Sequence, residues 1–410
     1  MRNHRLLLIL WVLVFLLGAL LRLPRLEQRP MHTDEAVHAV KFAALLQEGS
    51  YTYDADEYHG PTLYYFTLVP AWLRGERTFA ELSAATLRSV PLFFGLGLIL
   101  LPLLLTPFTG RWAALAAGLW TALSPMQIFY SRYYIQENLF VFAGFLTLML
   151  GARYFFQRHW GWAAGAGAAL GLLHATKETD ILLVAAAVLA GGVLWLRQRG
   201  RLRVEPLHLL IFLAAALLVS ALLLTAGFTH LQAFADSFTA YSGYLRRGAG
   251  NSLHLQPWYH YLRLLFFFQE PGRPLWSEAW LLPFVVSGCV LIARAFLQKE
   301  DSRRPAVLLF IALFTAALWL IYAVIPYKTP WNGLAAHYGL LLIAGVGTAG
   351  LLSSMRNRTA GILLLACCAL PLGIQAHLLN TTYASDPGNP WVYAHPGADL
   401  QRISILVEAA

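Results

Sequence analysis

The sequence has few charged residues. Asp, Glu, Lys and Arg make up only 12% of its 410 residues, whereas 58% are hydrophobic. A soluble domain cannot bury so much apolar material, and segments 6–21 and 181–196 are apolar on every side instead of on one helical face. We therefore predict an integral membrane protein in which such segments are transmembrane helices.

Cysteine is also scarce, and acidic residues are fewer than basic ones. The three cysteines, Cys289, Cys367 and Cys368, lie within apolar segments, which excludes a disulfide framework and a CxxC-type metal site. The net charge of +9 comes from short basic clusters between apolar segments, without a continuous basic domain. This pattern indicates membrane topology and argues against nucleic acid as a partner.

The apolar segments define the predicted fold class, an all-α polytopic membrane protein. We expect eleven spans, at 6–23, 87–106, 112–129, 137–155, 160–175, 181–197, 207–226, 279–297, 306–325, 333–352 and 360–378. The first follows a basic head but lacks a small-residue cleavage site, so we expect it to be retained. Basic short loops such as 197–206 place the N-terminus in the cytoplasm, and the odd number of spans places the C-terminus outside the cytoplasmic (inner) membrane.

Nothing of domain size faces the cytoplasm, so any chemistry is expected on the outer side. The predicted organisation is one transmembrane domain, 1–378, with long outer loops 24–86 and 227–278, and a short outer tail, 379–410.

Both long loops are expected to contain amphipathic helices. In the first loop, the pattern predicts a helix over Thr33–Glu48 that Gly49 ends, and a second helix that starts at Thr78 and runs into the second span. In the other long loop, the aromatic-rich segment 254–270 is typical of a helix at the lipid interface.

Ionisable side chains are concentrated in PMHTDEAVHAV, residues 30–40, just after the first span. On a helix from Thr33, Asp34 and His38 share a face, so that a carboxylate and an imidazole could act together. The spacing is equally compatible with an Asp34 that only caps the helix and complements its dipole. A divalent metal held by Asp34, His32 and His59 is a further possibility, but no tight spacing requires one. We therefore expect no necessary metal or cofactor.

Three other outer turns each contain a cation: Arg132 in SRYYIQEN, Lys177 in HATKETD and Lys328 in IPYKTPW. A single such residue can be an interface anchor, and Arg132 could simply pair with Glu137. Three of them in separate turns predict one outward-facing pocket, lined by carboxylates of the first loop and by these cations. Such a pocket suits a lipid with a phosphate head group at the membrane surface.

These motifs resemble those of the GT-C membrane glycosyltransferases, which include protein O-mannosyltransferases and the aminoarabinose transferase of lipid A. The resemblance rests on TDE, YHGPTLYY, SRYYIQEN and TKE. The pattern is closer still to the flippase-activity-associated proteins, through HTDEAVHA, YHGPTLYY, PWYHYLRLLFFFQE, PYKTPWN and NPWVYAHP. It extends from about residue 31 to the end of the chain. Several GT-C enzymes end in a soluble domain, whereas only a short tail follows the last span here.

The resemblance implies a transferase that moves a polyprenyl-phosphate-linked sugar to a glycan, lipid or protein acceptor, in contact with membrane lipids. It implies that Asp34, with Glu35 beside it and His38 to orient it, acts near the acceptor hydroxyl. Arg132 and Lys177 would contact the donor phosphate, and we expect Lys328 to join them. The other residues expected to line the substrate pocket are His32, Tyr58, His59, Glu137, Glu178, His254 and Trp258.

A transporter of lipid-linked glycans, or a flippase-accessory protein without transfer chemistry, is the alternative function. A transporter should need polar residues in the middle of several spans. Here the ionisable residues collect at the outer ends of the predicted spans, which favours surface chemistry. A purely structural subunit of a glycan-assembly complex is a third possibility.

Overall fold

The computed structural model describes residues 2–57, 59–197, 204–249, 254–298, 303–397 and 399. In chain order the α-helices are α1 (Arg2–Arg22), α2 (Thr33–Glu48), α3 (Thr62–Arg74), α4 (Ala84–Leu100), α5 (Thr106–Thr109), α6 (Arg111–Leu123), α7 (Pro125–Ser131), α8 (Glu137–Gln157), α9 (Trp160–His174), α10 (Asp180–Arg197), α11 (Pro206–Leu224), α12 (Gln232–Ala249), α13 (His260–Phe266), α14 (Leu282–Leu297), α15 (Arg303–Val324), α16 (Leu334–Ser354) and α17 (Arg358–Asn380). The 3-10 helices are η1 (Phe79–Glu81), η2 (Leu101–Leu105), η3 (Ala279–Leu281) and η4 (Pro330–Gly333). Across these ranges the chain forms no β-strand, only two isolated β-bridges.

Nine helical segments of the described chain are long and apolar enough to cross a membrane. The all-α polytopic class is therefore confirmed, whereas the count of eleven spans stays a prediction. The expected span at 112–129 is broken between α6 and α7, where Pro125 starts a new helix and Ser124 caps it by accepting the Gln127 N–H. The expected span at 160–175 corresponds to α9, which has 15 residues.

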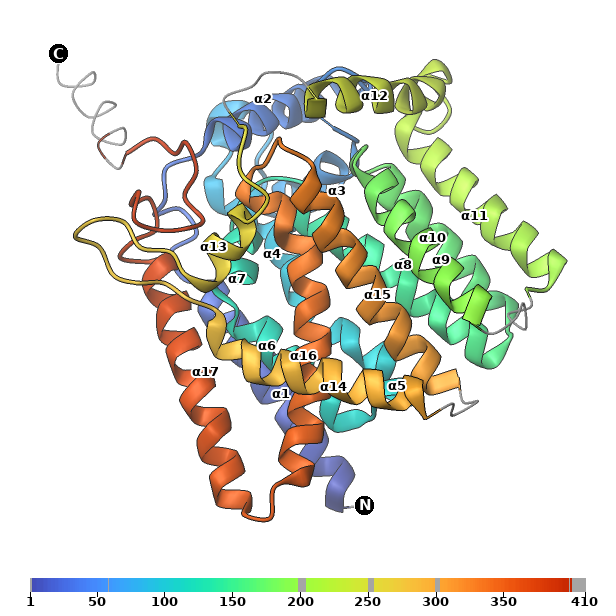
Figure 1. Ribbon diagram of the computed structural model, residues 1–410. Coiled ribbons are helices and arrows are strands. Elements are labelled where there is room, and N and C mark those ends of the chain that lie inside the picture. The colour runs from blue at the N-terminus through green and yellow to red at the C-terminus, as the bar shows by residue number, and fades with distance from the viewer. Residues whose placement is uncertain are drawn as a thin grey trace.

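The long connections gather at one end of the bundle (Figure 1). This end carries α2, α3, α12 and the C-terminal segment 381–397, and we call it the loop end. The N-terminus and the turn from α16 to α17 lie at the opposite end (Figure 1). Which end faces the cytoplasm stays a prediction from the positive-inside rule.

Glycines let neighbouring helices approach closely within the bundle. A Cβ added at Gly167 or Gly171 of α9 would collide with backbone carbonyls of α11, and one at Gly347 of α16 would collide with the Phe284 carbonyl of α14. Because lipid chains are as apolar as the helix surfaces, close van der Waals packing of this kind holds membrane helices together.

The first long loop confirms one expected helix and corrects the other. Helix α2 has the predicted bounds, and Gly49 ends it with a left-handed φ of 70°. Thr78 and Glu81 form the expected capping box, but the helix that they start is only the three-residue η1. Leu82 is extended and Ser83 caps α4 separately, so no continuous helix runs from Thr78 into the span. Helix α3, in an apolar stretch of the same loop, was not predicted.

Candidate active site

A cluster of aromatic and imidazole rings lies at the loop end, where four separate segments meet. We call it the ring cluster and define it as His32, Tyr133, Trp331, Tyr393 and His395. The His32 ring centroid lies 5.0 Å from that of His395 and 5.6 Å from that of Tyr133. The Trp331 ring lies 5.9 Å from Tyr133 and 5.8 Å from Tyr393. The first loop and two of the predicted turns therefore converge, joined by the C-terminal segment.

Asp34 lies at the edge of this cluster. Its side chain is 46% exposed, and its Oδ1 atom lies 3.8 Å from His32 Nδ1. The Asp34 charge also contributes to the raised pKa values of Tyr133 and Tyr393, for which burial is the main cause. The cap of α2 is His32, whose Nδ1 accepts the Asp34 N–H at 3.0 Å. The interpretation of Asp34 as the helix cap is therefore wrong, and its carboxylate is left facing the ring cluster.

Glu35, next to Asp34, is fully buried and fully committed to protein contacts. It accepts two hydrogen bonds from Arg88, at 2.8 and 2.9 Å, and one from the Tyr134 N–H at 2.9 Å. Its Oε2 also lies 3.5 Å from Arg29 Nη2. Burial alone would raise the pKa of Glu35, but the charges of Arg88 and Arg29 and these hydrogen bonds lower it to about 2. Glu35 is thus placed to hold the first loop against α4 and the 132–134 turn.

His38 does not pair with Asp34, although the two residues are four apart on α2. Its Nδ1 lies 2.8 Å from Tyr64 Oη, and its side chain is buried. Burial, together with the positive charges of His59 and Lys177, lowers the pKa of His38 to about 3, so the imidazole is neutral at neutral pH. The imidazole beside Asp34 is that of His32, and the expected Asp34–His38 pair is a wrong prediction.

Arg132 is buried and donates to three backbone carbonyls, one at the last residue of α1 and two just beyond it. Its guanidinium lies 3.0 Å from the Arg22 oxygen, 2.7 Å from that of Pro24 and 2.9 Å from that of Arg25. Burial is the main reason why the pKa of Arg132 is lowered to about 10, and the nearby Arg29 and Arg88 charges add to the effect. These bonds close the C-terminal end of α1, where carbonyls lack partners.

Lys328 has a similar position at the end of α15. Its ammonium donates to the Ala323 carbonyl at 3.1 Å and to the Ile325 carbonyl, and the residue is fully buried. Burial lowers the pKa of Lys328 below its ordinary value of 10.5. Its backbone N–H donates to the His254 carbonyl at 3.0 Å, which ties this turn to the second long loop.

Lys177 forms a buried ion pair with Glu137. The pair joins the α9–α10 connection to the first turn of α8. In the part of the chain that the structure describes, none of Arg132, Lys177 and Lys328 forms an ion pair with Asp34. The three predicted cations therefore come to the loop end without surrounding Asp34 directly, and their contact with a phosphate stays a prediction.

His59 and Glu178 form a second group of titratable residues. His59 Nδ1 lies 2.7 Å from Glu178 Oε2, and Tyr53 donates to Glu178 Oε1 at 2.8 Å. Burial opposes ionisation of Glu178, but His59 and these hydrogen bonds lower its pKa to about 2. A Cβ at Gly60 would collide with the Ala175 carbonyl, which explains why this loop needs glycine. The YHGPT and HATKE motifs thus pack against each other.

No group of three or more His, Cys, Asp or Glu side chains is arranged to hold a metal ion in the ranges described. His59 faces Glu178 and not Asp34. His254 contacts the Tyr393 hydroxyl and stacks edge-on against Tyr327 at 4.9 Å, next to the ring cluster. Trp258 is 66% exposed and lies outside the cluster. Tyr58 lies outside the described residues.

Several residues of this site were not predicted. Arg29 stacks over the rings of Phe129 and Tyr133, at 4.6 and 4.7 Å, and Arg88 binds Glu35. An arginine within an apolar span, such as Arg88, is a sequence signal for a buried carboxylate partner. His395 belongs to the NPWVYAHP motif, but nothing in that motif by itself indicates that the tail folds back onto the first loop.

Comparisons with known proteins bear on the fold that carries this site. Residues 59–224 match a family model described as dolichyl-phosphate-mannose-protein mannosyltransferase. The oligosaccharyltransferase of Archaeoglobus fulgidus in its apo form has a TM-score of 0.65 at 15% identity, over 95% of this chain and 56% of that chain. ArnT from Cupriavidus metallidurans bound to undecaprenyl phosphate has a TM-score of 0.63 at 18% identity, over 87% of this chain and 64% of that chain.

The chain has the GT-C fold. The fold expected from the resemblance of the motifs is thereby confirmed. The chain spans little more than half the length of the archaeal oligosaccharyltransferase. No curated protein sequence matches it. The closer resemblance to flippase-activity-associated proteins stays a prediction.

Proposed function

We propose that the chain is a membrane glycosyltransferase that moves a sugar from a polyprenyl-phosphate-linked donor to an acceptor outside the cytoplasmic membrane. Two neighbours by fold support the choice of donor. One is ArnT bound to undecaprenyl phosphate, and the other is the archaeal oligosaccharyltransferase AglB in complex with an inhibitory peptide and a dolichol-phosphate. The peptide in the second complex supports a protein among the expected classes of acceptor.

The half-exposed carboxylate of Asp34 carries this proposal. Glu35 is saturated by two arginines, and Glu137 and Glu178 are paired with Lys177 and His59. Asp34 instead combines an accessible carboxylate with a position against a ring cluster that can hold a sugar or a hydrophobic acceptor. A reacting carboxylate must be reachable by substrate, and Asp34 meets this condition.

The reaction needs only a base and positive charge. The acceptor hydroxyl oxygen forms a bond to the anomeric carbon while the bond from that carbon to the phosphate oxygen breaks. The proton of the hydroxyl goes to Asp34, and the bonding electron pair leaves with the polyprenyl phosphate. Fixed positive charge near the departing phosphate lowers the barrier. Asp34 stands in the first turn of α2, where the helix dipole favours negative charge.

Buried arginines supply the positive charge behind Asp34. Arg132 donates to the Arg22 carbonyl, Arg29 donates to the Arg132 carbonyl, and Arg88 donates to the Arg29 carbonyl, so the four lie together. Among the described residues, Glu35 is the one carboxylate that pairs with them. We place the donor phosphate on this side of Asp34. In this arrangement Arg132 acts mainly through its charge, and Lys177 and Lys328 fix the surrounding turns.

The test is Asp34→Asn in the full-length protein reconstituted in liposomes, with labelled undecaprenyl-phosphate sugars as donors and a membrane extract as the acceptor source. Asn keeps the size of the side chain but cannot accept the proton, so transfer should fall by roughly 10²–10⁴-fold. Glu48→Gln, at the exposed end of the same helix, is the matched control and should transfer normally.

The alternative function predicts another pattern. If the protein only moves or presents a lipid-linked glycan, transfer should stay at the background level of the extract with the unsubstituted protein and with Asp34→Asn alike. Lipid movement across the liposome bilayer should then also be the same for both proteins. Equal transfer by Asp34→Asn and by the unsubstituted protein, above the background without protein, would rule out Asp34 as the base.

A further inference from the structure

Three buried polar atoms beside Asp34 have no hydrogen-bond partner within the described chain. They are Arg29 Nε, Tyr133 Oη and His395 Nε2. The Arg29 guanidinium carbon lies 4.7 Å from the Tyr133 ring centre, and the Tyr133 ring lies 5.3 Å from that of His395. Buried polar groups are nearly always paired, so three unpaired ones in contact with one another require an explanation.

Each of the three atoms can donate a hydrogen bond. An arginine Nε always carries a hydrogen. Burial raises the pKa of Tyr133 well above its ordinary value, so its hydroxyl stays protonated. Burial lowers the pKa of His395 to about 3, so its ring is neutral. His395 Nδ1 lies 3.1 Å from the Tyr393 nitrogen and 3.2 Å from the Tyr393 oxygen, and in the tautomer in which Nδ1 accepts the Tyr393 N–H, the hydrogen is on Nε2.

The charge around these donors also calls for an anion. Arg22, Arg29, Arg88 and Arg132 are buried and lie close enough for their charges to interact, and among the described residues Glu35 is the one carboxylate that pairs with any of them. Asp34 offsets only one further charge. Buried cations are normally matched by negative charge, because an unmatched charge in a low-dielectric site is costly.

We propose that Arg29, Tyr133 and His395 together bind the phosphoryl oxygens of a lipid phosphate, and that the C-terminal segment completes this site by supplying His395. The choice of a lipid phosphate rests on the proposed function. The anion gives each donor an acceptor and offsets the excess of arginine charge. Asp34, which is 46% exposed beside His32, marks the side from which a ligand can approach these donors.

Asn389 holds the C-terminal segment in the position that this site requires. It is fully buried, and its side chain donates to the carbonyls of Leu379 and Tyr383 at 3.0 and 2.9 Å. Its Oδ1 accepts the Trp391 N–H at 3.0 Å. The segment is therefore anchored before Trp391, and the end that bears His395 meets the first loop through the rings of His395 and His32, whose centroids lie 5.0 Å apart.

Two tyrosines of the same turn provide a matched pair of variants. Tyr130 and Tyr133 are both fully buried, but the Tyr130 hydroxyl donates to the Trp391 carbonyl at 3.1 Å whereas that of Tyr133 has no described partner. Tyr133→Phe should weaken binding of undecaprenyl phosphate to the full-length protein in nanodiscs by about tenfold, equivalent to about 1.4 kcal/mol. It should not lower the melting temperature of the ligand-free protein. Tyr130→Phe should instead leave undecaprenyl phosphate binding unchanged and lower the melting temperature of the ligand-free protein.

His395→Phe keeps an aromatic ring against His32 and should also weaken undecaprenyl phosphate binding several-fold. Undecaprenol, which lacks the phosphate, should bind equally to all variants. If inorganic phosphate competes with undecaprenyl phosphate, and Tyr133→Phe weakens this competition, the site binds phosphoryl groups in general. If inorganic phosphate does not compete, the site is specific for the lipid-borne phosphate.

The inference is overturned if Tyr133→Phe and Tyr130→Phe have equal affinity for undecaprenyl phosphate, or if Tyr133→Phe weakens undecaprenol binding to the same extent. This outcome is distinct from failure of the proposed function. Asp34→Asn should retain undecaprenyl phosphate binding while it loses transfer. Transfer that survives in Asp34→Asn would leave the binding result standing.

Discussion

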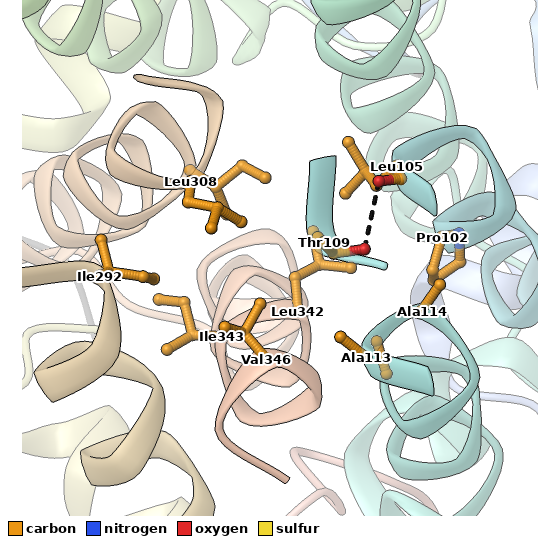
Figure 2. A pocket seen from close by; sticks show the side chains of 12 residues that line it. Pro102, Leu105, Thr109, Ala113, Ala114, Ile292, Leu308, Leu342, Ile343 and Val346 are labelled. Atoms are coloured by element: carbon orange, nitrogen blue, oxygen red, sulfur yellow. Dashed lines mark hydrogen bonds between the residues drawn. The ribbon is translucent and has the colours of Figure 1, made fainter. Parts of the chain in front are cut away.

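The two ends of the helical bundle bury different kinds of groups. The loop end buries arginines, carboxylates and histidines, several of them in specific pairs such as Glu35 with Arg88 and Glu178 with His59. The opposite end, to which α4 leads through η2 and α5, contains an apolar crevice between α5, α6, α14, α15 and α16 (Figure 2). The hydroxyl of Thr109 in this crevice is bound to the Leu105 carbonyl at 3.1 Å (Figure 2).

This difference indicates at which end of the bundle a ligand can be bound selectively. An apolar gap costs some packing energy but has no directional groups that could select a ligand. Buried ions are costly unless each is matched, and their arrangement at the loop end leaves Asp34 accessible and three donors unpaired. The polar end is therefore the one where chemistry is expected.

The largest effect on stability is expected at the loop end, for Glu35→Gln. The substitution leaves the buried charges of Arg29 and Arg88 without a carboxylate, which should lower the free energy of unfolding by about 3–5 kcal/mol. Denaturant unfolding of the full-length protein in detergent measures this change. Glu27→Gln, at an exposed position of the same connection, should have almost no effect. Equal stability of the two variants would contradict the structural role of Glu35.

An intermediate effect is expected when the pH is lowered. The pKa of His38 is about 3 in the folded protein, against an ordinary value of 6.5. Between these values the unfolded chain binds a proton that the folded chain does not bind, so the free energy of unfolding should fall as the pH drops below about 6.5. The pKa of Glu35, about 2 against 4.5, adds a loss of stability only below about pH 4.5. His38 is surrounded by Tyr64, His59, Lys177 and Glu35.

Melting temperatures between pH 7.5 and 5 separate the histidine contribution. His38→Asn keeps a polar atom near Tyr64 but cannot take up a proton, so its stability should decline less steeply with pH. His230→Asn, at an exposed position of the loop end, should keep the slope of the unsubstituted protein. If the melting temperatures of His38→Asn and His230→Asn fall equally steeply as the pH is lowered, His38 is not buried in its neutral form.

The smallest effect is expected in the crevice, for Leu308→Phe. The larger ring should fill part of the apolar space between α15 and α6 and change the free energy of unfolding by about 1 kcal/mol or less. Undecaprenyl phosphate binding should not change, because the proposed phosphate site lies at the other end. A large loss of binding would mean that the crevice takes part in lipid recognition, and would weaken the contrast between the two ends.

Sequence reasoning was most successful where one residue type or one period decides the structure. Long apolar segments predicted the membrane helices, and Gly49 correctly marked the end of α2. It was less successful where a side chain has more than one possible partner within reach. Asp34 and His38 share the spacing of a pair, but burial against Tyr64 drew His38 away and left His32 beside Asp34. Thr78 has the capping-box pattern, and the backbone still breaks at Leu82.

The sequence by itself therefore determined the class of protein and the motifs that come to the loop end, because hydrophobicity and turn residues act locally along the chain. Only the tertiary structure decided which charges meet. Arg132 and Lys328 closed helix ends, Lys177 paired with Glu137, and His395 joined the first loop from more than 350 positions away. The physical reason is that a buried charge takes the partner that the packed helices bring within reach, and sequence spacing does not encode that distance.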